Sequence, residues 1–170
     1  MANPDHLNVI ERKLIDNLRL GTYNTTSGTA SAWTNGNVKV FGSFPDTEHA
    51  QYPCIIVQHV ANGLETQFFG QQMGATEIGE LYGVGYDLYV AVDADSAFTV
   101  NGAVYKGRRL HNYLMLNTAN VIMDTDFSST DTEIVERHYS GFRDIRFDPN
   151  TEIYFATCSM IVVFKNTRPV

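Results

Sequence analysis

Residues 82–92 form the most regular stretch of the chain, because two kinds of side chain alternate there without a break. The apolar set is Tyr82, Val84, Tyr86, Leu88, Val90 and Val92, and the set between comprises Gly83, Gly85, Asp87, Tyr89 and Ala91. Successive side chains of a β-strand point to opposite faces of its sheet, so the alternation predicts a strand with one fully apolar face. Any fold of this chain must place that face against a core.

Shorter apolar runs predict further strands around this one. They fall at residues 38–41, 54–57, 132–139 and 153–165. The run 54–57 is apolar on both faces, which is typical of an interior strand. Asn101 and Gly102 lie between two apolar triplets, a pattern that predicts a tight β-hairpin. The last stretch has one apolar face and one interrupted by Thr157 and Ser159, so we expect the second face to be partly available.

Two amphipathic helices are expected, one near the N-terminus and one over residues 106–124. Their inward-facing residues are Leu7, Ile10, Leu14, Ile15 and Leu18 in the first, and Leu110, Tyr113, Leu114, Val121 and Ile122 in the second. Spacings of three and four residues place such side chains on one helical stripe. The order of elements predicts a single α+β domain over residues 1–170, with two helices packed on one face of a mainly antiparallel sheet. The opposite face is then free for subunit contacts or for lining a cavity.

The segment of residues 64–80 follows no regular period. Phe68, Phe69 and Met73 lie there among glycines and paired glutamines. One interpretation is a wide hairpin whose aromatic side chains fold back on the sheet. The other is a projecting arm that docks on a neighbouring subunit, since two adjacent aromatics in an extended segment cannot both face one sheet. In the second interpretation Phe68, Phe69 and Met73 form a subunit interface.

The net charge of −7 comes from one part of the chain. Residues 41–104 contain eight acids and no Lys or Arg, whereas residues 1–39 sum to +1 and residues 106–170 hold eight bases and eight acids. A block of one sign repels polyanions, so some surface of the fold is kept negative. The chain also lacks a basic stripe interleaved with aromatics, which disfavours nucleic-acid binding.

No motif in the chain identifies a reaction. The histidines are scattered, with no pair spaced to share one helical face, at His6, His49, His59, His111 and His138. Asp93 and Asp95 could hold a hard cation, but they lack the ring of oxygen ligands that calcium needs. Arg108 and Arg109 open the second helix, where bases oppose the helix dipole, so we expect them to be solvated and not to bind phosphate. We therefore expect no enzyme, no catalytic residue, no cofactor and no metal.

Cys54 and Cys158 both lie in apolar runs. This placement favours two buried, reduced thiols, and a disulfide between them is the alternative. No apolar run approaches the ~20 residues that cross a bilayer. Polar and charged residues also interrupt the first positions, where a secretory signal would be apolar. We therefore expect a protein made in the cytoplasm without a membrane partner.

The order of the elements resembles that of one family of viral proteins. An amphipathic helix, a short strand and a turn at Phe44-Pro45-Asp46 precede the strand Tyr52-Pro53-Cys54-Ile55-Ile56-Val57. The long strand 82–92, a second helix and a closing strand pair follow. Over residues 7–164 this arrangement is similar to that of the tail terminator proteins of tailed bacteriophages. The resemblance rests on element order and on one strand led by proline.

The resemblance implies a structural virion protein that forms a ring, hexameric in the family, on the last ring of the tail tube. Such a ring stops tube growth and presents the surface to which the neck docks. The implied partners are copies of the chain itself, the tail tube protein and a neck or head-completion protein, with DNA passing through unbound. The implied location is the virion tail, after assembly in the host cytoplasm. Alternatives are a neck, connector or tail-tube subunit, or a small cytoplasmic enzyme or ligand-binding α+β domain.

Asp87, Asp93 and Asp95 are the acids that we expect to line the DNA channel of such a ring. All three share the face of the 82–92 strand that lies opposite its apolar stripe. A wall without bases would not hold DNA, because each Lys or Arg contact to a phosphate adds attraction through counterion release. The alternative is an outer surface kept acidic for solubility or for a basic neck partner.

Overall fold

The computed structural model describes residues 6–20, 38–46, 50–60, 65–72, 77–100, 102–127 and 133–169. In chain order the elements are α1 (His6–Leu20), β1 (Lys39–Phe41), β2 (Cys54–His59), β3 (Glu65–Gln72), β4 (Glu77–Asp93), β5 (Ala97–Val100), β6 (Ala103–Lys106), α2 (Gly107–Asp124), β7 (Glu133–Asp148) and β8 (Ile153–Pro169). Both expected helices are confirmed, and each strand expected from an apolar run has a counterpart.

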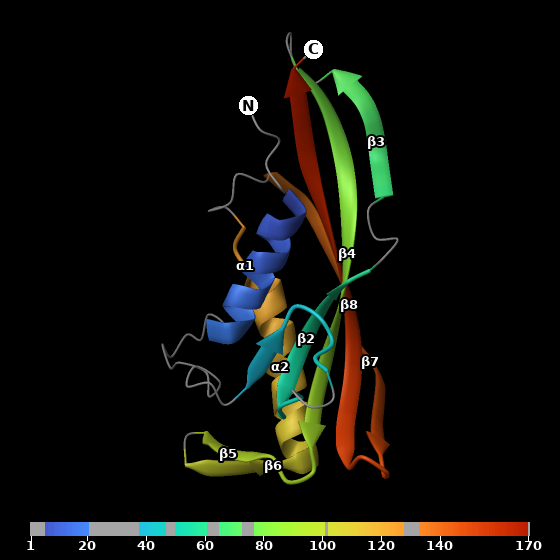
Figure 1. Cartoon of the computed structure of the whole chain (residues 1–170). Coiled ribbons are helices and arrows are strands. Elements are labelled where there is room, and N and C mark those ends of the chain that lie inside the picture. The colour runs from blue at the N-terminus through green and yellow to red at the C-terminus, as the bar shows by residue number, and fades with distance from the viewer. Residues whose placement is uncertain are drawn as a thin grey trace.

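A six-stranded sheet forms the body of the molecule (Figure 1). Its strand order is β1-β2-β4-β8-β7, and β3 pairs with β4 at the end that extends beyond the helices. The pairing of β1 with β2 is parallel, and every other pairing in this sheet is antiparallel. Strands β5 and β6 form a separate hairpin, in which Gly102 has a φ of 79° that suits a tight turn. The hairpin prediction is therefore confirmed.

Strands β4 and β8 are the longest elements and form the axis of the sheet. Each has 17 residues, and they pair from Glu77 opposite Pro169 to Asp93 opposite Ile153. Leu88 lies opposite Cys158, so the apolar sets of both strands share one face of the sheet. That face is buried along its central part. The period of two in residues 82–92 therefore identified the central strand and its core side.

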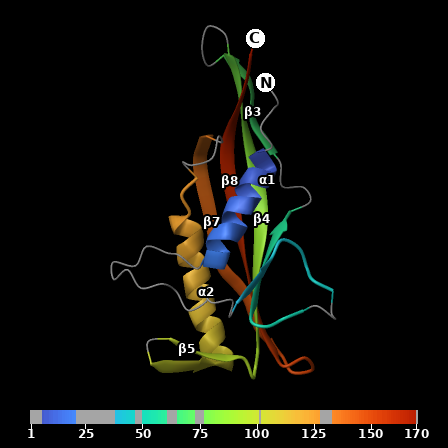
Figure 2. The ribbon, with the colours of Figure 1, turned by 60° about the vertical axis from the view of Figure 1, so that its left-hand side comes forward.

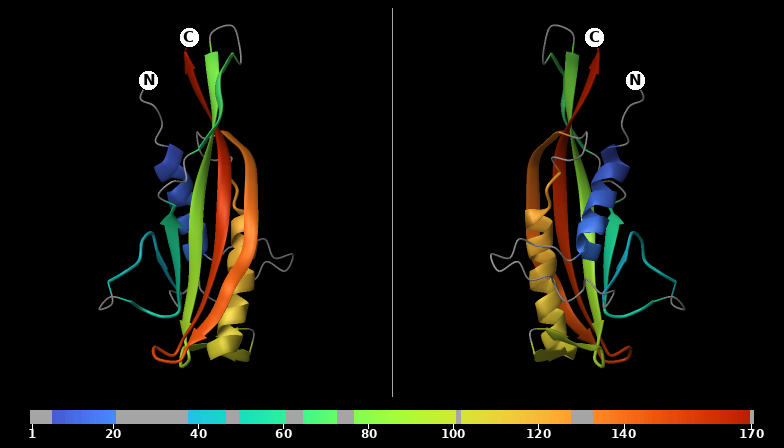
Figure 3. Two further views of the ribbon diagram at one scale, coloured as in Figure 1. Left: turned by 90° about the vertical axis from the view of Figure 1, so that its right-hand side faces the viewer. Right: turned by 90° about the vertical axis from the view of Figure 1, so that its left-hand side faces the viewer.

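Both helices cover this apolar face, as two further orientations show (Figures 2 and 3). The core joins buried residues of α1, α2 and β4, namely Ile10, Leu14, Leu18, Leu110, Leu114, Val121, Ile122, Val84, Leu88, Val90 and Val92. Tyr86 is also fully buried, and its hydroxyl donates a hydrogen bond of 3.3 Å to the backbone oxygen of Leu7. This bond satisfies a buried polar group and ties α1 to β4. The fold is α+β with two helices on one face of a mainly antiparallel sheet, as the sequence predicted.

Strand β7 extends well beyond the residues 132–139 that the sequence indicated. It is the last strand in the sheet order and pairs only with β8, which leaves most of its side chains exposed. Register shifts interrupt the pairing, and Gly141 and Asp144 have positive φ angles. A bulged edge strand buries no continuous face, so it lacks the alternation that reveals a strand in sequence.

Truncating a side chain of the shared core should destabilise the fold. We expect Leu114→Ala to lower the free energy of unfolding by about 2–5 kcal/mol, because the substitution removes buried methyl groups and leaves a cavity. Leu116→Ala is the matched control on the same helix, since Leu116 is 64% exposed, and it should change stability by less than about 0.5 kcal/mol. Urea unfolding followed by circular dichroism measures both. Equal effects of the two variants would contradict the placement of α2.

Candidate functional site

The face of the sheet that the helices leave uncovered is the main candidate surface (Figure 3, left). We call it the helix-free face and define it by alternate side chains of β2, β4 and β8, namely Cys54, Ile56, Asp87, Tyr89, Ala91, Phe155, Thr157 and Ser159. Their register places Ile56 opposite Tyr89 and Asp87 opposite Ser159. The sequence predicted a second face available for contacts, and this surface is that face.

One part of the helix-free face is apolar and aromatic. Cys54, Ile56 and Ala91 are buried there in a small second core beneath aromatic side chains. The ring of Tyr89 lies 4.8 Å from that of Phe44 and 5.6 Å from that of Phe155, measured between centroids. A groove of about 600 Å³ opens beside these rings, between the stretch that leads into β2 and the hairpin that joins β7 to β8. Phe44 is 49% exposed, so apolar surface remains uncovered in this chain alone.

The neighbouring part of the face is polar and brings an acid and a base together. The Ser159 hydroxyl donates a hydrogen bond of 2.6 Å to Asp87, and Arg143 of β7 donates one of 2.7 Å to the same hydroxyl. The Ser140 hydroxyl accepts a bond from the Ser159 backbone N–H at 3.0 Å. Burial raises the pKa of Tyr89 next to this group, Asp87 raises it further, and Arg143 opposes the shift. Asp87 thus has a cation, Arg143, close to it. Residues 41–104, to which Asp87 belongs, contain no Lys or Arg of their own.

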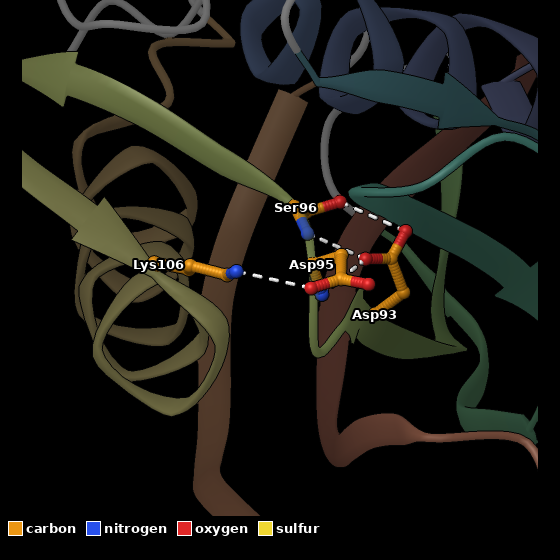
Figure 4. A network of polar contacts seen from close by, with 4 residues as sticks. All are labelled: Asp93, Asp95, Ser96 and Lys106. Carbon is orange, nitrogen blue, oxygen red and sulfur yellow. Dashed lines mark hydrogen bonds and ion pairs between the residues drawn. The ribbon is translucent and has the colours of Figure 1, made fainter.

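Asp93 and Asp95 lie at the end of β4, away from Asp87, in the turn that leads to β5 (Figure 4). The Asp93 carboxylate accepts hydrogen bonds from the backbone N–H groups of Asp95 and Ser96 and from the Ser96 hydroxyl. Asp95 pairs with Lys106 across a distance of 3.0 Å. Asp93 therefore stabilises the local turn, and Asp95 forms an exposed ion pair with β6. The structure does not bring the three expected channel residues into one patch.

The expected interface residues belong to the β3 region. Phe68 and Phe69 lie in β3, which pairs with the first part of β4 through two register shifts. This backbone pairing fits the hairpin interpretation of residues 64–80. The side chains of Phe68 and Phe69 lie outside the described part of the structure, as does the whole of Met73. Docking of this region on a neighbouring subunit stays a prediction.

Two arginines of β7 that sequence reasoning did not single out contact the helix-free face. Arg143 and Arg146 come from the part of β7 that has no apolar alternation, and Arg146 lies over the ring of Phe155 at 5.4 Å. In the sequence, Phe155 belonged only to the second face of the last predicted strand, the face that Thr157 and Ser159 interrupt. The alternation within residues 153–165 could have placed Phe155 on this face. No local pattern could have indicated that Arg146 lies over its ring. Among the described residues, no group of three or more His, Cys, Asp or Glu is placed to hold a metal ion.

Both cysteines are free and buried, on opposite faces of the sheet. This confirms the expectation of two buried thiols. Burial raises the pKa of both Cys54 and Cys158 to about 12. The thiolate is the reactive form of cysteine, so both side chains are poor nucleophiles at neutral pH.

No known protein-family model matches the chain, and no curated protein sequence matches it. No helix among the described residues is long and apolar enough to span a bilayer.

Thiol labelling should report the burial of both cysteines. At pH 8 a thiol with a pKa near 12 is ionised in only about one molecule in 10,000, whereas an exposed one is ionised in roughly a quarter. We expect slow reaction of the native protein with a disulfide reagent and complete reaction of two thiols in urea. Val104→Cys supplies the control, because Val104 is 58% exposed and should react at once. Native thiols that react as fast as that control would contradict the placement of the two strands.

Proposed function

We propose that the chain is a structural subunit of a ring that caps a phage tail tube, as a tail terminator does. The observation that carries the proposal is the helix-free face, where an apolar groove and the uncovered ring of Phe44 lie on a sheet that helices protect on one side only. Exposed apolar patches of this kind mark surfaces that other proteins cover. The order of the elements resembles that of tail terminator proteins, and this resemblance is why we propose a ring and not another kind of assembly.

A ring needs two different, complementary surfaces on each subunit, because the same contact repeats head to tail until it closes. The helix-free face offers one such surface. The edge strand β7 offers another, since Val135 is 52%, Ile145 60% and Phe147 45% exposed. An edge strand with free backbone groups and apolar side chains is a natural site for a second chain. These two features support a heterologous contact between copies.

The proposed partners are further copies of the chain, a tail tube protein and a neck or head-completion protein, with DNA passing through unbound. Asp87 is the acid best placed to face a channel, since Asp93 accepts the hydrogen bonds of a turn and Asp95 pairs with Lys106. The Ser159 hydroxyl joins Arg143 to Asp87, so the positive charge of Arg143 partly offsets the negative charge of Asp87. The channel wall at this point would therefore be only weakly acidic. A neck or tail-tube role is the alternative within the same class of assembly.

The mass of the native particle tests the assembly. A hexamer of the 19.0 kDa chain has six times that mass, about 114 kDa. We expect mass photometry to find particles of this size or of another closed ring, and electron microscopy to show end-on views with a central hole. A stable monomer at high concentration would overturn the ring proposal. End-on and side views of intact virions then separate a terminator at the tube end from a tube or neck subunit.

The interface role of β3 can be tested separately from its role in folding. We expect Phe68→Ser combined with Phe69→Ser to weaken ring assembly by at least about tenfold in the dissociation constant, because buried aromatic anchors dominate interface energies. The monomer should keep its circular dichroism spectrum and melting temperature. Val104→Ser, at an exposed position of the small β5-β6 hairpin, is the control. Normal assembly of the double variant, or its unfolding, would show that β3 is not an intersubunit arm.

A further inference from the structure

The groove beside Phe44 and the hairpin of β3 and β4 lie at opposite ends of the molecule (Figure 1). The register of β4 and β8 places Glu77 opposite Pro169 at one end and Asp93 opposite Ile153 at the other. Strand β3 pairs with β4 near the first of these ends, whereas the groove is lined by Ile153 and the β7-β8 connection at the second. A strand of 17 residues spans roughly 50 Å at ~3.3 Å per residue. The tip of the hairpin therefore cannot reach the groove of its own chain.

The groove combines apolar rings with arginines that have donors to spare. Phe44 and Phe155 line it, and Arg146 is the only base among its lining residues. The guanidinium of Arg146 lies over the ring of Phe155 and has no hydrogen bond or ion pair with any described residue. Arg143 lies on the same face of β7 and donates one hydrogen bond, to the Ser159 hydroxyl. A guanidinium carries five N–H donors, so both side chains can bind a further acceptor.

The one acid that lines the groove is already engaged in its own turn. The Asp148 carboxylate accepts hydrogen bonds of 2.9 Å from the backbone N–H of Asn150 and from the Thr151 hydroxyl. The bond from Asn150 is the main reason that the pKa of Asp148 is lowered. Asp148 therefore leaves the donors of Arg143 and Arg146 available. Arginine favours a carboxylate as a partner, because the charge-assisted hydrogen bonds can form in pairs.

The hairpin has the composition that complements the groove. We call residues 64–79 the acidic hairpin. They contain five large apolar residues and two acids but no Lys or Arg, namely Leu64, Phe68, Phe69, Met73 and Ile78 with Glu65 and Glu77. The next acid, Glu80, is buried and accepts a hydrogen bond from the Tyr82 hydroxyl, so it belongs to the body of the sheet. Apolar residues in a segment that extends beyond the helices are typical of a surface that a partner covers.

Charge favours a second copy of the chain as the occupant of the groove. The cations beside the groove are the two arginines of β7, and the acidic hairpin supplies two carboxylates without a base. The apolar residues of the hairpin match the aromatic lining in the same way. A nucleic acid also carries negative charge, but the net charge of −7 repels a polyanion. One segment of the chain thus complements both the charge and the apolar character of the groove.

We propose that the acidic hairpin of one copy occupies the groove of a second copy. Phe68 and Phe69 enter among the rings of the groove, and Arg143 and Arg146 bind the hairpin carboxylates. The contact is heterologous and joins the copies end to end, because its two surfaces differ and lie at opposite ends of the chain. The inference rests on the proposed assembly of identical copies and names the contact between them.

Reversing one charge tests the role of the arginines. We expect Arg146→Glu to raise the dissociation constant for self-association about tenfold or more, because the change places like charges against each other. Arg146 is exposed, so the variant should keep the melting temperature of the parent protein. Arg12→Glu on α1 is the matched control, since Arg12 is exposed and pairs only with Asp16 of the same helix. Analytical ultracentrifugation measures both, and equal effects of the two variants would overturn the proposal.

Mixing two variants tests the end-to-end geometry. The groove variant carries Phe44→Ser and Arg146→Glu and keeps its hairpin, whereas the hairpin variant carries Phe68→Ser and Phe69→Ser and keeps its groove. Each variant alone should be monomeric. A mixture should give a dimer of about 38 kDa, twice the 19.0 kDa of the chain, and nothing larger, because a mixed pair has one intact contact. Absence of the dimer, or larger particles in the mixture, would contradict the hairpin-groove contact.

The state of the parent protein separates this inference from the ring proposal. If the parent forms closed rings and Arg146→Glu assembles normally, the hairpin-groove contact is wrong while the ring proposal stands. If the parent forms open filaments that both variants dissolve, the contact is supported and the ring proposal is wrong. A parent that stays monomeric at high concentration overturns both and leaves the groove to a different protein.

Discussion

The pairing of β4 with β8 is the constraint on which the rest of the molecule depends. It continues through 17 positions of each strand without a register shift. Because side chains alternate between the two faces of a sheet, a slip of one residue would turn every apolar side chain of one strand away from the helices. Burial of one face under α1 and α2 therefore selects this register. Neither helix would have an apolar surface to cover without it.

The same pairing decides what the uncovered face contains. Tyr89, Asp87 and their partners on β8 occupy it because the alternate positions are in the core. Strand β7 then brings Arg143 to the Ser159 hydroxyl, which is also bonded to Asp87, and Lys106 of β6 pairs with Asp95. The long acidic stretch of the chain is thus partly neutralised by bases from its second half. Whether this acidic stretch would repel DNA in a channel depends on these contacts and on how copies of the chain assemble.

The sequence predicted those elements that have a strong local period. Both helices, the β5-β6 hairpin and the central strand follow from side-chain spacing and from turn residues. Strand β7 was only half predicted, because the bulged second half lies at the sheet edge and buries no regular face. The groove beside Phe44 could not be predicted, since it is formed by segments far apart in the chain.

By itself, the sequence determined the class of fold, the side of the central strand that faces the core and the burial of both cysteines. These follow from local periodicity and from hydrophobic burial, which act on neighbouring residues. Only the tertiary structure decided that Arg143 and Asp87 both bond to the Ser159 hydroxyl, and that Arg109 lies over the ring of Tyr105. The physical reason is that charges, rings and unsatisfied donors interact through space over a few ångströms. The number of residues between two such groups in the sequence does not indicate how far apart they lie in space.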